Sequence, residues 1–137
     1  MRHLVFVYGT LMRGERNHRY LASSIYRGRW RTPPVYNLHS LTSYPVACPD
    51  GRQRLSGEVY RISRQTLCQL DGLEEYPLVY SRKLITTPWG PAWLYLQAHA
   101  PAEAIPLPSG DWRRRTARPQ CRSGFEPVSI RQPFSRQ

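Results

Sequence analysis

Leu4-Val5-Phe6-Val7-Tyr8-Gly9-Thr10-Leu11 is the stretch around which the rest of the chain is interpreted. It begins as a short apolar run, rich in β-branched and aromatic residues, and such a run predicts a central strand buried on both faces of a sheet. Gly9 allows a turn at little steric cost, so the backbone N–H groups of Gly9, Thr10 and Leu11 are candidates to bind a small anion or a carbonyl oxygen. An ordinary strand followed by an ordinary turn explains the same residues.

The length and the charge distribution indicate one folded domain followed by a basic tail. The chain has 137 residues, is 40% hydrophobic and contains four tryptophans and nine tyrosines, which is enough for one core. Its formal net charge is +11, and residues 113–137 contain seven arginines but one glutamate. That segment has few large apolar side chains to offset the entropy of ordering it. We therefore predict a domain over residues 1–112 and an arginine-rich tail over 113–137 that can be partly ordered.

The cysteines and histidines do not favour a metal site or a disulfide framework. The three cysteines are widely spaced and form no C-x-x-C pair, and the four histidines lack metal-ligand spacing. We expect no metal and no cofactor. No apolar stretch is long enough to span a membrane, and the first strand starts too early to leave room for a signal peptide. A cytoplasmic protein is expected.

The segments after the first strand predict a short helix and then extended structure. Asn17 is a good N-cap, so a short helix is expected to begin there. Residues 25–38 alternate loosely and contain Pro33-Pro34, which fits one irregular edge strand. Residues 43–51 are expected to form a brief extended piece that closes in an Asp-Gly turn.

The second half of the domain adds strands around one further helix. Residues 55–62 predict a strand in which Gly57 marks a bulge or a close backbone approach. Ser63 is expected to cap a helix with a narrow apolar stripe formed by Leu67, Leu70 and Leu73. Residues 79–87 and 92–97 predict a β-hairpin. The fold class expected is α+β, with a small mixed, barrel-like sheet and two or more short helices.

Two motifs, one in the loop after the first strand and one around the end of the second predicted helix, carry a family resemblance. The first is Val7-Tyr8-Gly9-Thr10-Leu11 followed by Asn17-His18, and the second consists of Leu70-Asp71, Glu74, Tyr80 and Arg82. Together they resemble the gamma-glutamylcyclotransferase-like family, including its gamma-glutamylamine cyclotransferase members and the bacterial YtfP-like proteins. The similarity covers nearly all of residues 1–112 and implies the fold of that family.

The resemblance implies an enzyme in which the α-amine of a small γ-glutamyl compound attacks its own γ-carbonyl. The products are 5-oxoproline and an amine or amino acid, and the substrate itself supplies the proximity. By resemblance Glu74 is the general acid and base, and Tyr80 and Tyr95 line the pocket. The amides of Gly9, Thr10 and Leu11 are candidates for the substrate carboxylate or the oxyanion, and the Tyr8 hydroxyl for a further hydrogen bond.

Each of these residues also has an ordinary structural interpretation. The helix end and the apolar neighbours of Glu74 are expected to raise its pKa, but an acidic pair after a helix is often only solvated. Tyr80 and Tyr95 fit strand packing. Glu75 stands where many family members carry glycine, which leaves the loop geometry open. Other structural readings are a helix cap for Asn17, a surface or packing position for His18, and for Arg82 an ion pair with Glu58 or Asp71.

A second function remains open at this point. Some YtfP-like members keep the fold and lack the equivalent glutamate, so the alternative is an inactive small-ligand-binding or nucleic-acid-associated module. Clustered arginines in the tail attract phosphates whatever the fold, although few aromatic residues are interleaved for base stacking. The sequence distinguishes neither the leaving group of a γ-glutamyl substrate nor the oligomeric state.

Overall fold

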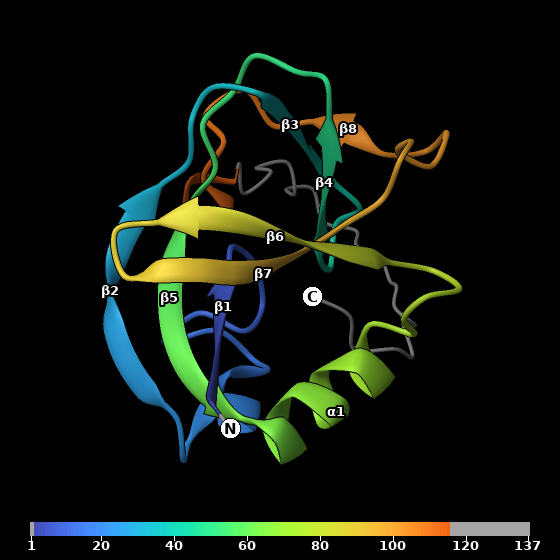
Figure 1. Cartoon of the computed structure of the whole chain (residues 1–137). Coiled ribbons are helices and arrows are strands. Elements are labelled where there is room, and N and C mark those ends of the chain that lie inside the picture. Colours follow the sequence, from blue (N-terminus) through green and yellow to red (C-terminus); the bar gives the residue numbers. More distant parts are fainter. Residues whose placement is uncertain (1, 116–137) are drawn as a thin grey trace.

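The computed structural model describes residues 2–115, which form two β-sheets with one α-helix beside them (Figure 1). The larger sheet has the strand order β2-β5-β1-β7-β6 and the smaller one the order β4-β3-β8. The strands of the larger sheet are β1 (Arg2–Val7), β2 (Ile25–Arg31), β5 (Ser56–Ser63), β6 (Ser81–Thr87) and β7 (Gly90–Leu96). Those of the smaller sheet are β3 (Tyr36–Ser40), β4 (Pro45–Pro49) and β8 (Ile105–Pro106). The helix α1 spans Arg64–Leu73, and 3₁₀ turns occupy His18–Leu21 (η1) and Trp112–Arg114 (η2).

Strand β1 is the centre of the larger sheet, as the apolar run predicts. It pairs antiparallel with β5 on one side and parallel with β7 on the other. Val5, Phe6 and Val7 are completely buried. Other strands of the sheet therefore flank β1 on both sides.

The larger sheet is strongly curled, so the barrel-like α+β prediction is confirmed. In Figure 1 the β6–β7 hairpin crosses in front of β5 and β1, and its turn reaches β2 at the far edge of the sheet. No hydrogen-bonded pairing joins the edge strands β2 and β6 in the part of the chain that the structure describes, so the barrel is not closed. The curl leaves a hollow between the hairpin and the strands behind it.

The predictions for β5, α1 and the hairpin are confirmed. The Ser63 hydroxyl oxygen accepts a hydrogen bond from the Thr66 N–H at 3.0 Å, which caps α1. Leu67 and Leu70 are buried and pack the helix onto the core. A Cβ atom at Gly57 would lie 2.3 Å from the Val7 carbonyl oxygen, so this glycine allows the close backbone approach that was expected.

The prediction of one irregular strand over residues 25–38 is wrong. The segment forms the edge strand β2 of the larger sheet and then most of β3, which lies in the middle of the smaller sheet. Pro33 and Pro34 fall between the two strands, because a proline has no N–H to donate to a ladder. The pair therefore marks the crossing from one sheet to the other.

The described part of the basic segment contacts the domain. The Arg113 guanidinium lies 3.2 Å from the Glu58 carboxylate and also donates to the Arg13 carbonyl oxygen. Arg115 pairs with Glu15 at 3.4 Å. The predicted tail from residue 116 onward lies outside the described residues, so its partial ordering and its attraction for nucleic acid stay predictions.

Candidate active site

The carboxyl end of β1 is fastened to two other strands through the side chain of Tyr8. The Tyr8 hydroxyl donates to the Tyr95 carbonyl oxygen at 2.8 Å and accepts from the Ala47 N–H at 3.2 Å. Tyr8 is completely buried. From the sequence, this hydroxyl was a candidate to form a hydrogen bond with the substrate. In the structure it donates to the backbone of β7.

The loop after β1 is held in shape by Asn17. A turn forms from the Met12 N–H to the Gly9 carbonyl oxygen at 3.1 Å, and the Asn17 N–H donates to the Thr10 carbonyl oxygen at 2.9 Å. The Asn17 side-chain amide also donates to the Thr10 hydroxyl at 2.9 Å. The expected role of Asn17 as a side-chain helix cap is wrong, because its side chain reaches back to the loop instead. Asn17 therefore positions the backbone of the loop.

His18 supports the same loop from the other side. Its Nδ1 atom lies 2.9 Å from the Leu11 carbonyl oxygen, and its ring packs against the ring of Tyr60. The sequence gave His18 a surface or packing position, and the packing part of that reading fits these contacts. Thr10 and Leu11, the loop residues next to these contacts, are themselves buried.

Glu74 lies at the end of α1 and is completely buried. Its backbone keeps helical angles, and its N–H donates to the Leu70 carbonyl oxygen at 2.9 Å. Glu75, by contrast, is exposed and has a φ of 55°, a left-handed conformation that favours glycine. This conformation fits the glycine that the family resemblance implies for many members at that position. The pair is therefore asymmetric, with a buried carboxyl group at 74 and a solvated one at 75.

The charge of Glu74 acts on the tyrosines at the carboxyl end of β1. Burial raises the pKa of Tyr8 well above its ordinary value, and the charge of Glu74 raises it further. Burial also raises the pKa of Tyr95, with additional contributions from Asp71 and Glu74. Glu74 thus interacts electrostatically with both tyrosines. Helix α1 and strand β1 are separated in the sequence and contact each other in the fold.

A second carboxylate on the same helix organises the wall of this region. Asp71 binds Arg82 through two contacts, at 2.8 Å from Nε and 3.0 Å from Nη2, and accepts a hydrogen bond from the Tyr95 hydroxyl at 2.6 Å. Of the two partners considered for Arg82, Asp71 is the one observed. Asp71 and Glu74 are three positions apart, a spacing that places side chains on one side of a helix. The sequence gave no sign of the Asp71–Tyr95 contact.

Tyr80 joins the same assembly through β4. Its hydroxyl donates to the Pro45 carbonyl oxygen at 3.0 Å, on the strand whose Ala47 contacts Tyr8. Tyr80 and Tyr95 are both completely buried, and each has a defined hydrogen bond. The structure therefore collects the predicted residues Tyr8, Thr10, Tyr80 and Tyr95 around one region. We call this region, together with Glu74 and Asp71, the carboxyl-end site.

A polar recess of about 400 Å³ adjoins the carboxyl-end site at Thr10. Arg16 and Arg115 are among the residues that line it, as is the indole of Trp112. Within residues 2–115 there is no group of three or more His, Cys, Asp or Glu side chains placed to hold a metal ion. Over the same residues no helix has the length and apolar character needed to cross a bilayer.

These observations define a class of protein, a small α+β domain with a buried carboxyl group near the carboxyl end of its central strand. The sequence model of the family described as "Gamma-glutamyl cyclotransferase, AIG2-like" matches residues 5–114. The chain belongs to this family, and it is a gamma-glutamylcyclotransferase-like enzyme.

Relatives and solved structures agree with this assignment. A Vibrio cholerae relative is 46% identical over 115 residues, which cover 84% of this chain and 99% of its own. The gamma-glutamylcyclotransferase family protein YtfP of Escherichia coli is 39% identical over 81% of this chain and 96% of its own, and its solution structure has a TM-score of 0.65. Human gamma-glutamylaminecyclotransferase is 37% identical over 60% of each chain. A crystal structure from Pyrococcus horikoshii has a TM-score of 0.71 at 27% identity, over 80% of this chain and 89% of its own.

Proposed function

We propose that this protein releases 5-oxoproline from a small γ-glutamyl compound, with Glu74 as the general acid and base. The observation that carries the proposal is the completely buried Glu74, three residues after the Asp71 that accepts from Tyr95, whose carbonyl oxygen in turn accepts from Tyr8 at the carboxyl end of β1. A buried, positioned carboxyl group is suited to moving a proton between two nitrogen atoms of one substrate.

The proposed reaction forms one C–N bond and breaks another, with no oxidation or reduction. The Glu74 carboxylate takes a proton from the substrate α-ammonium group, and the resulting amine attacks the γ-carbonyl carbon. Glu74 returns this proton to the leaving nitrogen, and the bond between the γ-carbon and that nitrogen breaks. Glu74 then takes the second proton from the new ring nitrogen, which becomes the lactam N–H, and passes it to the released amine, which departs as an ammonium ion. Glu74 ends ionised, as it began, so one carboxyl group completes the cycle.

The loop after β1 supplies the polar groups for the rest of the substrate. We assign the amides of Gly9, Thr10 and Leu11 to the substrate carboxylate or to the oxyanion at the γ-carbon. Asn17 fixes this loop through two hydrogen bonds to Thr10, so little reorganisation is needed when charge develops. The adjoining recess is lined by Arg16 and Arg115 together with Glu15, which pairs with Arg115. Arg16 therefore supplies the net positive charge on the side where we propose that a carboxylate enters.

The cysteines of the described residues fit a reducing compartment. Cys48 and Cys68 are both free in the described part of the chain. We therefore propose a cytoplasmic location, where small γ-glutamyl compounds are the partners of the site.

The test is a panel of γ-glutamyl compounds assayed for 5-oxoproline with the wild type and with Glu74→Gln. The panel contains γ-glutamyl amino acids, γ-glutamyl amines and γ-glutamyl-ε-lysine. General acid and base catalysis is worth about 100-fold to 10,000-fold, so the variant should lose turnover by that amount while its thermal unfolding stays that of the wild type.

Glu75→Gln is the matched control, because it makes the same chemical change at the exposed neighbour. It should retain full turnover. Wild-type turnover that persists in Glu74→Gln would refute the role given to Glu74. A panel in which no compound yields 5-oxoproline, although some bind, would replace the proposal with the inactive ligand-binding alternative.

A further inference from the structure

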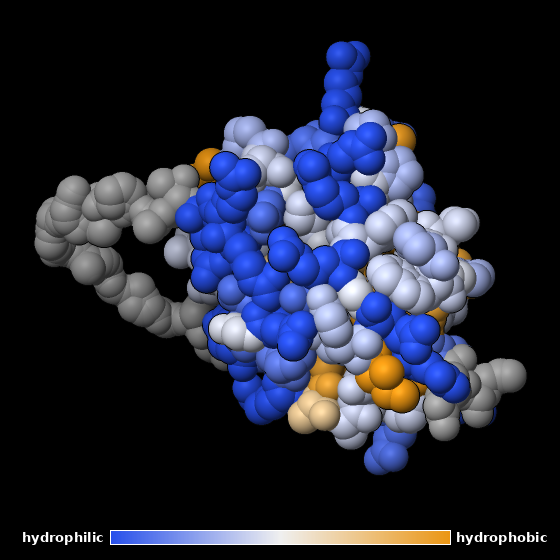
Figure 2. Space-filling view, turned by 90° about the vertical axis from the view of Figure 1, so that its left-hand side faces the viewer, coloured by the Kyte–Doolittle hydropathy of each residue, from blue (hydrophilic) through white to orange (hydrophobic). Residues whose placement is uncertain are grey.

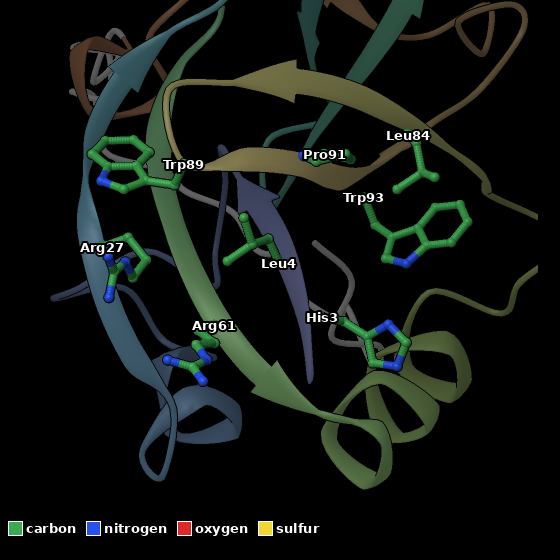
Figure 3. Close-up of a pocket in the computed structure, with 8 residues that line it drawn as sticks. All are labelled: His3, Leu4, Arg27, Arg61, Leu84, Trp89, Pro91 and Trp93. Carbon is green, nitrogen blue, oxygen red and sulfur yellow. The ribbon is translucent and has the colours of Figure 1, made fainter. Parts of the chain in front are cut away.

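A second hollow lies at the amino end of β1, away from the Glu74 carboxylate. It has a volume of about 440 Å³ and lies among β1, β2, β5 and the β6–β7 hairpin (Figure 3). We call it the amino-end hollow. The residues that give it its character are two tryptophans, two arginines, a histidine and a leucine: Trp89, Trp93, Arg27, Arg61, His3 and Leu4.

A β-bulge turns Arg27 toward this hollow. The register of β2 against β5 shifts between Tyr26 and Gly28, so Arg27 is an extra residue in the ladder. A bulge of this kind re-aims a side chain that regular pairing would direct elsewhere. In Figure 3 Arg27 and Arg61 lie on neighbouring strands beneath the Trp89 ring. The bulge therefore brings two guanidinium groups to one side of the hollow.

The two tryptophan rings are held in place by the protein. Gly28 has a φ of 153°, and a Cβ atom there would lie 2.7 Å from the Trp89 ring, so the ring rests directly on the backbone of β2. The guanidinium carbon of Arg82 lies 4.1 Å from the centre of the Trp93 ring, and Asp71 fixes that arginine. Rings that are already ordered lose little conformational entropy when they bind a ligand.

The charge of the hollow has one sign. Its lining contains Arg27, Arg61 and His3 and no carboxylate among the described residues. Neither arginine forms an ion pair with another residue of the described range, whereas Arg82 and Arg113 each do. The neighbouring surface over β2 is strongly hydrophilic in Figure 2, and Arg27, Arg29 and Arg31 are exposed there. An anion entering the hollow therefore meets two guanidinium groups that no carboxylate among residues 2–115 pairs with.

We propose that the amino-end hollow binds a nucleotide, with its base against the tryptophan rings and its phosphate on Arg27 and Arg61. Aromatic side chains accept any base by stacking, worth about 1–3 kcal/mol per base. Guanidinium groups bind phosphate oxygens through paired, charge-assisted hydrogen bonds. A free mononucleotide and one nucleotide of a single strand share this chemistry. The inference does not depend on the 5-oxoproline reaction.

Binding to the full-length protein tests the proposal. The probes are AMP, followed by tryptophan fluorescence, and a fluorescein-labelled oligothymidylate of about ten nucleotides, followed by polarisation. The variant is Arg27→Gln with Arg61→Gln, and its matched control is Arg29→Gln with Arg31→Gln, which removes the same charge from the same region of the surface. All variants keep the same arginine-rich C-terminal segment, so that segment contributes equally.

The hollow variant should bind both probes about tenfold more weakly, and the control should change by less than about threefold, since only the first pair contacts the phosphate. Equal losses in the two variants would overturn the proposal, because they would show general attraction to a basic surface. Wild-type protein that binds neither probe would overturn it too. Wild-type preference for AMP or for the oligothymidylate identifies the source of the nucleotide, and either preference supports the site.

Recognition of the base needs its own measurement. Trp89→Leu should weaken AMP binding about tenfold and leave the weaker binding of ribose 5-phosphate unchanged, because only AMP has a ring to stack. If ribose 5-phosphate and AMP bind equally to the wild type, the hollow recognises phosphate alone and the nucleotide assignment is wrong. Unchanged circular dichroism and thermal unfolding confirm that each variant is folded.

Discussion

The two ends of β1 differ in almost every property that matters for chemistry. At the carboxyl end Tyr8, Glu74, Tyr80 and Tyr95 are completely buried, and the Tyr8 hydroxyl is hydrogen-bonded to strands of both sheets. At the amino end the hollow is open, basic and aromatic, and its arginines carry no counter-charge from the described residues. A buried carboxyl group suits proton transfer, and an open pair of guanidinium groups suits anion binding. The two ends of one strand therefore suit two kinds of chemistry.

The physical origin of this difference is which elements lie over each end of β1. The carboxyl end of β1 is covered by α1, β4 and β7, which exclude water from Glu74. The amino end faces the gap between the edge strands β2 and β6, where no pairing closes the barrel within the described part of the chain. A chain of contacts from Asp71 to Arg82 to Trp93 links the two regions.

The largest effect is expected from Glu74→Asp, which tests the carboxyl end alone. The shorter side chain withdraws the carboxyl group by roughly the length of one bond, and a displacement of about 1 Å can cost about 100-fold in rate. We expect 5-oxoproline formation to fall by about that factor, and AMP binding at the amino-end hollow to stay unchanged. Turnover at the wild-type level would show that the position of this carboxyl group does not matter.

Asp71→Asn tests whether the two ends are coupled. The change removes a charged acceptor shared by Arg82 and Tyr95, at a cost of about 2 kcal/mol in the free energy of unfolding. Since Arg82 also packs on Trp93, both 5-oxoproline formation and AMP binding should decrease. Urea unfolding gives the stability, and the two functional assays are run on the same preparation. A loss in one assay alone would show that the ends are independent.

Alkaline pH should lower the free energy of unfolding through the buried tyrosines at the carboxyl end. The pKa values of Tyr8 and Tyr95 are raised in the folded protein, so below the ordinary tyrosine pKa of about 10 both states are protonated and stability is complete. Above about pH 10 only the unfolded state ionises, and each such tyrosine removes about 1.4 kcal/mol per pH unit. Tyr95→Phe should reduce the slope of the unfolding free energy against pH by the contribution of one tyrosine. Urea unfolding from about pH 9 to about pH 11, on either side of the ordinary tyrosine pKa, measures this slope. An unchanged slope would contradict the raised pKa of Tyr95.

The smallest effect is expected from Gly72→Ala, which strengthens the support of Glu74. Gly72 lies in the last turn of α1, and a Cβ atom there meets nothing within 4 Å. Alanine should stabilise the helix by about 0.5–1 kcal/mol, because it has the higher helix propensity. Turnover and AMP binding should both stay at the wild-type level, with stability again read from urea unfolding. A loss of turnover would show that the carboxyl-end site needs flexibility in this turn.

Much of the fold could be predicted from the sequence, because its signals are local. The apolar run of β1, the Ser63 cap with its leucine stripe, and the hairpin each depend on residues a few positions apart. The prediction failed over residues 25–38, where the choice between one strand and two depends on which sheet each half pairs with. It failed at Asn17 as well, since a cap and a loop contact use the same short polar side chain.

The candidate site could be predicted in part. The motifs named Tyr8, Thr10, Glu74 and Tyr80, and the family resemblance added Tyr95. All five are buried in the structure, and their roles at a site stay predictions. The bond between Asp71 and Tyr95 was not foreseen, and neither was the amino-end hollow, whose Arg27 depends on a bulge. A bulge is a mismatch between two paired strands, so no single segment reveals it.

The sequence by itself determined which segments become strands, where α1 begins, and which family motifs the chain carries. Only the tertiary structure decided that Glu74 is buried while Glu75 is exposed, and that Arg27 and Trp89 share a hollow. The reason is the range of the forces involved. Periodicity, capping and turn preferences act between neighbours in the chain, whereas burial and charge depend on which distant segments the sheet brings into contact.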